Sequence, residues 1–322
     1  MEKFYFSRFT FSVRCKTTLF LPSYSGSTLR GGFGHAFRRI ICAFKGKECT
    51  DCLLRGQCVY AYIFETPIPA DAQIMRKYTA APHPFILEPF TNSRKPYQQG
   101  ENFSFGLTLI GRAVDYLPYF IYAFEELGRI GIGKGRGKYE LREVTEEGSE
   151  DDVLQKKRAI YSGDTKLLTQ TNPSIQWPEI LINHPLPPPA ISVSFITPTR
   201  IKYKNSLTKD LEFHVFFRNL LRRISLLSYF HCNHRIDDSG FKDLIEQARK
   251  IKTIKRTLYW HDWERYSNRQ KTLMKMGGFM GEITYEGELK EFRPYIRLGE
   301  YVHVGKGSGF GLGRYRIENR GG

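Results

Sequence analysis

The sequence predicts an α+β fold built from two related halves. The chain ends in a stretch with glycine at every second position from Gly305 to Gly313, and the same Gly-Lys-Gly core occurs earlier, in Leu127 to Tyr139. In both halves a strand and an apolar helix precede the glycine stretch, which indicates a divergent internal repeat. With 322 residues, 41% of them hydrophobic, the chain is long enough for two domain-sized cores. We call Leu127 to Tyr139 loop 1 and Val302 to Tyr315 loop 2.

The first half predicts the order β-α-β-β-α-β. β-branched and aromatic residues predict an opening strand that ends before Pro22, and an apolar stripe at helical spacing predicts the first helix. The expected elements are a strand over Phe4 to Leu21, a helix over Leu29 to Phe44, a strand over Phe103 to Ile110 and a helix over Leu117 to Leu127. The prolines between Glu65 and Tyr97 predict an irregular loop or an extended connection.

A proline-rich segment, Asn183 to Pro189, predicts the linker between the halves. We therefore expect an N-terminal domain at 1–150, connecting strands and the linker at 151–189, and a C-terminal domain at 190–322. The second half restarts with an alternating strand over Ile191 to Arg200 and a helix over about Leu211 to Phe230. In that helix Arg222-Arg223-Ile224 repeats Arg38-Arg39-Ile40 of the first helix.

The two glycine loops are candidate phosphate-binding sites. Glycine allows positive φ and close approach of backbone N–H groups to an anion, and each loop carries cations. A dinucleotide-binding fold has no room after Gly313, and the GK[ST] triplet of a P-loop is absent. A glycine-rich turn that only closes a sheet is the alternative. The candidate residues are Lys134, Arg136 and Lys138 in loop 1, and Gly305, Lys306, Gly307, Gly309, Gly311, Gly313 and Arg314 in loop 2.

The charge of the chain favours nucleic acid as its partner. There are 49 Lys and Arg against 33 Asp and Glu, a formal net charge of +16. No basic amphipathic helix and no apolar run of about 18 residues indicates a membrane protein, so a cytoplasmic protein is expected. The segment from Trp260 to Lys271 alternates aromatic and basic residues, which fits RNA contact and an inward-packed hairpin equally well. It adds Arg265 and Arg269 to the candidate RNA-binding residues, with Arg38, Arg39 and Arg222 on the helices.

Four cysteines predict a metal site. Cys42, Cys49, Cys52 and Cys58 follow the pattern C-x6-C-x2-C-x5-C, and four thiolates at such spacing fit one tetrahedral ion. A structural zinc is favoured over an iron–sulfur cluster, and a set of packed thiols is the alternative.

His35 is the candidate catalytic histidine. At about 100° per residue it lies nearly opposite the apolar stripe of the first helix, with Arg38 and Arg39 one turn away. It is therefore expected at the surface beside two cations, where an idle surface histidine is the alternative. His261 is a weaker candidate.

These segments resemble the CRISPR-associated endoribonucleases that process precursor CRISPR RNA, members of the RAMP superfamily. The resemblance spans nearly the whole chain and is carried by Leu29 to Arg39, Cys49 to Cys58, Phe195 to Arg200, Trp263 to Gln270, Gly277 to Phe279 and loop 2. It implies two tandem ferredoxin-like (βαββαβ) domains that hold repeat RNA across a basic face. The RNA would be cut once per repeat without a catalytic metal.

The resemblance also implies the chemistry. The RNA's own 2′-OH attacks, which leaves a 2′,3′-cyclic phosphate and a 5′-OH end. His35 matches the family's histidine on the first helix and would transfer a proton. Arg38, Arg39 or Lys45 would stabilise the charge on phosphorus, and Tyr24 is a possible second proton-transfer group.

Two other functions share most of these features. A non-catalytic RAMP subunit would bind guide RNA inside a CRISPR effector complex, together with other effector subunits. A metal-containing RNA-binding module unrelated to CRISPR would bind without regard to the repeat.

Overall fold

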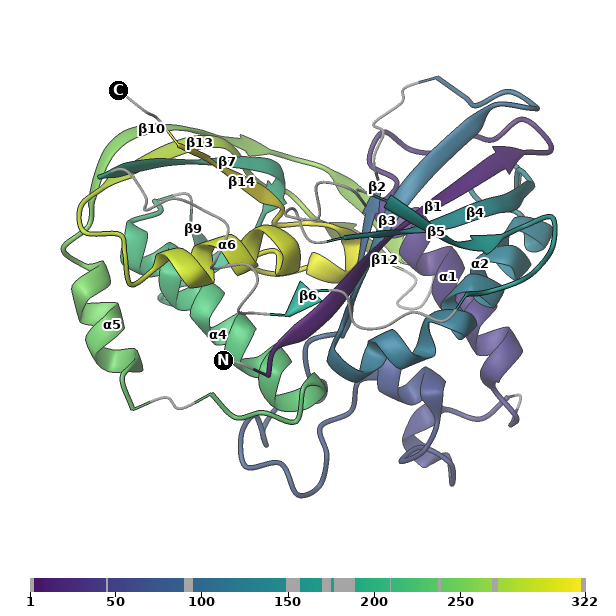
Figure 1. Cartoon of the computed structure of the whole chain (residues 1–322), viewed down its shortest axis with the longest axis horizontal. Coiled ribbons are helices and arrows are strands. Elements are labelled where there is room, and N and C mark those ends of the chain that lie inside the picture. The colour runs from purple at the N-terminus through teal and green to yellow at the C-terminus, as the bar shows by residue number, and fades with distance from the viewer. Residues whose placement is uncertain are drawn as a thin grey trace. The chain divides into compact units, whose positions relative to one another are not determined.

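The computed structural model describes residues 3–44, 46–89, 95–148, 157–169, 175–176, 189–208, 210–236, 239–267 and 272–319. The chain divides into two compact units (Figure 1). The N-terminal unit comprises Glu2–Gln176 and Leu226–His234, and the C-terminal unit comprises Trp177–Ser225 and Arg235–Gly322. Most of the predicted linker, residues 183–188, lies outside the described residues.

The N-terminal unit is an antiparallel sheet with two helices. Its elements are β1 (Tyr5–Cys15), α1 (Gly26–Ile41), β2 (Phe85–Pro89), β3 (Asn102–Ile110), α2 (Leu117–Ile130), β4 (Tyr139–Glu147), β5 (Lys157–Ser162) and β6 (Ile175–Gln176). The sheet order is β2-β3-β1-β4-β5, and β6 pairs with β1. The first strand thus lies between the third and the fourth, which is the ferredoxin-like order.

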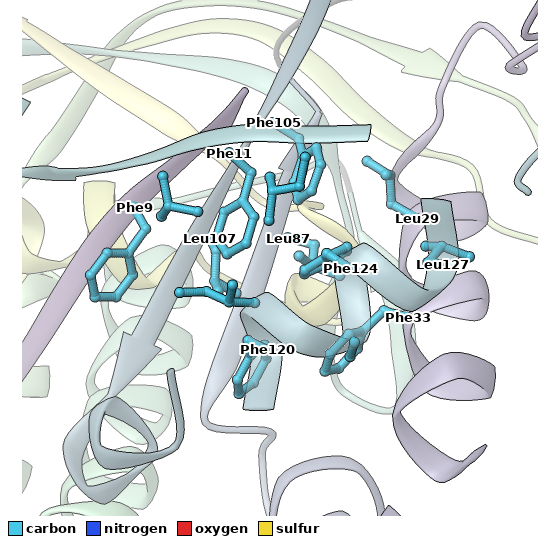
Figure 2. Close-up of a cluster of buried hydrophobic side chains, with 14 of the residues drawn as sticks. Phe9, Phe11, Leu29, Phe33, Leu87, Phe105, Leu107, Phe120, Phe124 and Leu127 are labelled. Atoms are coloured by element: carbon cyan, nitrogen blue, oxygen red, sulfur yellow. The ribbon is translucent and has the colours of Figure 1, made fainter. Parts of the chain in front are cut away.

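The core of this unit lies between the sheet and its helices. Alternate residues of β1, among them Phe9 and Phe11, are buried against α1 and α2. Phe33 of α1 stacks on Phe120 of α2 with ring centroids 4.8 Å apart. Figure 2 shows these aromatic rings gathered between the strands and the two helices. Burial of this face of α1 leaves its opposite face, which carries His35, to solvent.

The C-terminal unit repeats the same topology. Its elements are β7 (Ala190–Thr199), β8 (Ile201–Tyr203), β9 (Ser206–Thr208), α4 (Phe213–His231), α5 (Phe241–Ala248), β10 (Lys252–His261), β11 (Glu264–Ser267), β12 (Thr272–Lys275), β13 (Gly278–Glu286), α6 (Arg293–Val302) and β14 (Tyr315–Asn319). The order β10-β13-β7-β14 again reads second, third, first, fourth. The hairpins β8–β9 and β11–β12 and the helix α5 are additions to this pattern. No helix of the described residues is long and apolar enough to cross a membrane.

Three element predictions differ from the structure. The opening strand ends at Cys15, not Leu21, because Leu19 and Phe20 form single bridges to Tyr97 and Lys134 and do not continue the ladder. The helix expected over Leu29 to Phe44 spans Gly26–Ile41. The segment expected to be an irregular loop or an extended connection contains β2, whose Phe85, Ile86 and Leu87 are buried against β3. Tertiary pairing and burial outweigh the local effect of the surrounding prolines.

Candidate nucleic-acid interface

Each glycine loop is held by the same two backbone hydrogen bonds. In loop 1 the Ile132 N–H donates to Gly137 O at 2.9 Å, and the Lys134 N–H donates to Phe20 O at 3.1 Å. In loop 2 the Val304 N–H donates to Gly313 O at 3.0 Å, and the Lys306 N–H donates to Arg200 O at 2.9 Å. Each loop therefore closes on itself and attaches to the segment that follows the first strand of its own unit.

The exit of each loop is duplicated as well. The Lys138 N–H donates to Thr17 Oγ1 and the Arg314 N–H to Thr197 Oγ1, both at 2.9 Å. The tyrosine that follows is buried in each unit and donates to a helix carbonyl: Tyr139 to Phe124 O at 2.9 Å, and Tyr315 to Ile296 O at 2.7 Å. The internal repeat predicted from the glycine pattern is thus present in the hydrogen bonding. Loop 2 is the longer version, because it includes a 3-10 helix at Ser308–Phe310.

Close backbone approach explains the shared Gly-Lys-Gly core. Gly133 has φ 76°, and a Cβ there would lie 2.1 Å from Phe20 O. Gly305 has φ 82°, and a Cβ there would lie 2.5 Å from Arg200 O. Any side chain at these positions would push the loop away from its attachment.

The loops differ at the residue that directly follows the preceding helix. The Gly131 N–H donates to Leu127 O and the His303 N–H to Gly299 O, so His303 stands where loop 1 has glycine. His303 keeps a φ of 61°, which is unfavourable for a residue with a Cβ. Its buried Nδ1 lies 3.1 Å from Leu312 O and donates to it, which ties the two ends of loop 2 together.

The cations of loop 1 face solvent. Lys134, Arg136 and Lys138 are exposed, and within the described residues none of them forms an ion pair. In loop 2, Lys306 is exposed and Arg314 is half-buried. Arg129, the fourth cation of loop 1, lies 3.7 Å from Glu126 and pairs with it. Loop 1 therefore offers the other three positive charges to a ligand.

His35 lies on α1 close to the root of loop 1. It is exposed, as its position opposite the apolar stripe predicts. One turn earlier, a Cβ on Gly32 would lie 2.9 Å from Leu127 Cδ1 and 3.6 Å from Ile132 Cδ1, so α1 packs directly on this root. One turn later, Arg39 Nε lies 3.3 Å from Glu126 Oε1 of α2. Since residues three and four apart share a helix face, His35 lies between these two contacts.

Several other candidates have protein contacts or lie outside the described residues. Arg38 donates to Lys47 O at 2.7 Å, which directs its guanidinium toward the cysteine segment. Tyr24 is half-buried just before α1, and Arg222 is exposed on α4. Lys45 and Arg269 lie outside the described residues, as does the side chain of Arg265. The roles predicted for these residues stay predictions.

Arg223 is a functional candidate that sequence reasoning missed. It lies on the buried side of α4, and its Nε donates to Val302 O at 2.7 Å, at the end of α6 where loop 2 begins. Burial lowers the pKa of this guanidinium to about 10. Arg222-Arg223 and Arg38-Arg39 are therefore similar in sequence but not in structural role. Arg39 is exposed, whereas Arg223 is buried and supports loop 2. The sequence signal for this burial was the position of Arg223 on the same helix stripe as the apolar residues Leu220, Ile224 and Leu227.

The four cysteines of the predicted metal site are half-buried free thiols. Burial, and next the charge of Glu65, raise the pKa of Cys49, and Cys42 and Cys58 act in the same direction. In the described part of the chain no three His, Cys, Asp or Glu side chains converge as metal ligands, and Cys49 and Cys58 pack against the N-terminal core. The cysteine-rich metal site stays a prediction.

Comparison with protein families matches both halves. Residues 4–173 match a family described as an N-terminal domain. Residues 193–315, which include most of β7 and all of loop 2, match the family described as CRISPR-associated endoribonuclease Cas6.

Individual relatives extend over almost the full length. An uncharacterized protein of Archaeoglobus fulgidus is 24% identical over 314 residues, which is 95% of this chain and 98% of that protein. The fold is similar to a Cas6 product complex, with TM-score 0.58 and 16% identity over 97% of this chain and 100% of that one. It is also similar to Thermus thermophilus Cas6, with TM-score 0.55 and 15% identity over 98% and 99%. A partial Cas6-RT-Cas1–Cas2 complex gives TM-score 0.56 at 13% identity, over 98% of this chain and 46% of that chain.

Proposed function

We propose that this chain, whose residues 193–315 match the family of CRISPR-associated endoribonuclease Cas6, cuts precursor CRISPR RNA within its repeats, without a catalytic metal. The observation that carries the proposal is the position of His35. An exposed imidazole lies on α1 one turn from the point where this helix packs on the root of a glycine loop with three exposed cations. A strand bound by those cations would pass close to a group able to move protons.

The reaction needs proton transfer and charge stabilisation. The 2′ oxygen forms a bond to the adjacent phosphorus and the bond to the 5′ oxygen breaks, which gives a 2′,3′-cyclic phosphate and a 5′-OH. His35 takes the proton from the 2′-OH or gives one to the leaving 5′ oxygen, and Tyr24 or Lys45 serves the other step. An imidazole with a reference pKa near ~6.5 suits either role near neutral pH.

Loop 2 binds the RNA backbone in this proposal, and two buried residues hold it in place. Lys306 and Arg314 contribute charge, and the glycines from Gly305 to Gly313 let phosphates approach the main chain. Arg223 and His303 act by holding the two ends of the loop in place. They are positioning residues and do not touch the RNA.

The partner proposed for this chain is CRISPR repeat RNA. One similar structure is a Cas6 product complex, and another is a partial Cas6-RT-Cas1–Cas2 complex. Other CRISPR proteins are accordingly proposed as further partners.

The proposed reaction predicts cleavage without metal and with a required 2′-OH. Protein dialysed against EDTA is expected to cut a repeat RNA at one site, and a single 2′-deoxy substitution at that nucleotide is expected to stop cutting, since the nucleophile is removed. Mass spectrometry of the products checks the ends. Retained cutting of the deoxy RNA would refute the mechanism, and tight binding of wild-type protein without any cutting would favour the non-catalytic subunit.

We also propose that the four cysteines bind one structural zinc ion. The support is their spacing and their partial burial as free thiols in one short segment. Elemental analysis of protein purified without added metal is expected to find about one zinc per chain. Cys52→Ser is expected to lose most of it, whereas Cys15→Ala, at a buried thiol of β1, is expected to keep it. Absence of zinc from the wild-type protein, or iron in its place, contradicts this proposal.

A further inference from the structure

Phe20 and Lys134 form an exposed pair beside loop 1. The Phe20 side chain is 48% exposed, and Lys134 is exposed as well. The two residues are opposed in a single antiparallel bridge, in which Phe20 O accepts the Lys134 N–H. Directly opposed residues project their side chains to the same side, with Cβ atoms about 4.5–5.5 Å apart. The two side chains therefore start from neighbouring points on the same side of the bridge, and both are exposed.

Two glycines of loop 1 determine the surroundings of this pair: Gly133 allows the bridge to form, and Gly135 leaves open space next to it. Gly133 allows the close approach of Phe20 O, because a Cβ would lie 2.1 Å away. Gly135 also has a positive φ, 80°, but nothing lies within 4 Å of the place where its Cβ would be. The next residue, Arg136, adopts a φ of 52° although it has a Cβ, and it is exposed. The loop thus presents open backbone and a cation at the same point.

The charges at this surface have no acidic partners in the part of the chain that the structure describes. Within the described residues, Lys134, Arg136 and Lys138 form no ion pair, whereas nearby Lys16 pairs with Glu140 at 3.0 Å. Unpaired cations beside an exposed aromatic ring match the two parts of a nucleotide. The cations attract phosphate, and the ring offers a flat face to a base. An acidic protein surface would pair with the cations but would not account for an exposed aromatic ring beside them.

We propose that Phe20 stacks on an unpaired base of the RNA while Lys134 and Arg136 bind its neighbouring phosphates. Loop 1 is then an RNA-binding site in its own right, in addition to loop 2. The base must be unpaired because a base inside a duplex is already stacked on its neighbours. The inference rests on the proposed function for the identity of this RNA as a CRISPR repeat.

Affinity measurements test the stacking role. The probe is full-length repeat RNA with the 2′-deoxy substitution at the cleaved nucleotide, titrated against the intact protein at several salt concentrations. Phe20→Ala is expected to weaken binding about 5- to 100-fold, and Phe20→Trp is expected to bind as the wild type does. Lys134→Gln is expected to reduce the salt dependence by about one phosphate contact. Phe44→Ala is the matched control, since Phe44 is 42% exposed and its ring lies 5.9 Å from Lys47 Nζ, a cation outside loop 1.

Crosslinking tests the location. Single 4-thiouridine substitutions along the same RNA, irradiated in the complex, are expected to crosslink at one unpaired position to the peptide that contains Phe20. The proposal is overturned if Phe20→Ala binds as tightly as the wild type, if Phe20→Leu binds as tightly as Phe20→Trp, or if crosslinks fall on Val302 to Tyr315 alone. It is also overturned if the variants lose affinity for heparin to the same degree, because the surface would then be a general anion site.

These outcomes are separate from the fate of the proposed function. A wild-type protein that binds the repeat through Phe20 but does not cut it would remove the enzymatic proposal and leave this one standing. A protein that cuts the repeat normally, with Phe20→Ala equal to wild type in affinity, would do the reverse.

Discussion

Replacing His35 with alanine is expected to lower the rate of repeat cleavage by about 10²–10⁴-fold, with RNA affinity nearly unchanged. The imidazole is exposed and lies one turn from Gly32, where α1 packs on the root of loop 1. In the proposed mechanism it transfers a proton and adds little to binding. Because His35 contributes nothing to the N-terminal core, the substitution is expected to change the free energy of unfolding by no more than about 0.5 kcal/mol.

Single-turnover cleavage with enzyme in excess separates the chemical step from binding. His35→Gln is the matched variant, because it keeps a polar side chain of similar length but does not titrate near neutral pH, and it is expected to be as inactive as His35→Ala. His261→Ala, at an exposed histidine of the C-terminal unit, is expected to cut normally. Cleavage by His35→Ala at the wild-type rate would show that another group moves the proton, and Tyr24 would be the next to replace.

Local patterns predicted the repeated parts of the fold well. Each loop has alternate glycines followed by a basic residue and a tyrosine. These residues recur because the same backbone conformation and the same hydrogen bonds form in both units. Gly133 and Gly305 are required by the carbonyls of Phe20 and Arg200, and this requirement is visible in the sequence. The two-unit fold with matching strand order followed from that repeat.

Features that depend on distant contacts were not predictable in this way. β2 is a strand because β3 pairs with it and the core buries it, although prolines surround it in the sequence. Arg223 resembles a surface arginine in a basic helix, yet its guanidinium lies inside the unit and binds the Val302 carbonyl. Only the position of α6 relative to α4 reveals that contact.

The candidate site also has features that local sequence predicted and features that depend on tertiary contacts. Helical periodicity was sufficient to place His35 at the surface, because the apolar stripe of α1 defines its opposite face. The contact between α1 and loop 1 could be recognised only in the tertiary structure. Gly32 has no side chain, so its residue type does not indicate that Leu127 packs against it. The exposure of Phe20 beside Lys134 was not predictable either, because a phenylalanine at the end of a strand is ordinarily a core residue.

Gly133→Ala and Gly135→Ala are expected to differ strongly although the two glycines have almost the same conformation. Their φ values are 76° and 80°, so alanine at either position costs about 1–2 kcal/mol of backbone strain. At Gly135 that is the whole expected effect, because the place of the new methyl group is open. At Gly133 the methyl group would also meet the Phe20 carbonyl at 2.1 Å, which adds about 1–3 kcal/mol or displaces the loop.

Displacement of the loop breaks the bond between the Lys134 N–H and Phe20 O, and with it the alignment of ring and ammonium group on the surface. Gly133→Ala is therefore expected to lower both the melting temperature, by about 2–4 °C for each kcal/mol, and the affinity for repeat RNA, whereas Gly135→Ala loses less of each. Thermal unfolding and RNA titration of the two variants side by side provide the measurement. Equal effects at the two positions would mean that strain alone accounts for both glycines and that the attachment of loop 1 to Phe20 has no part in binding.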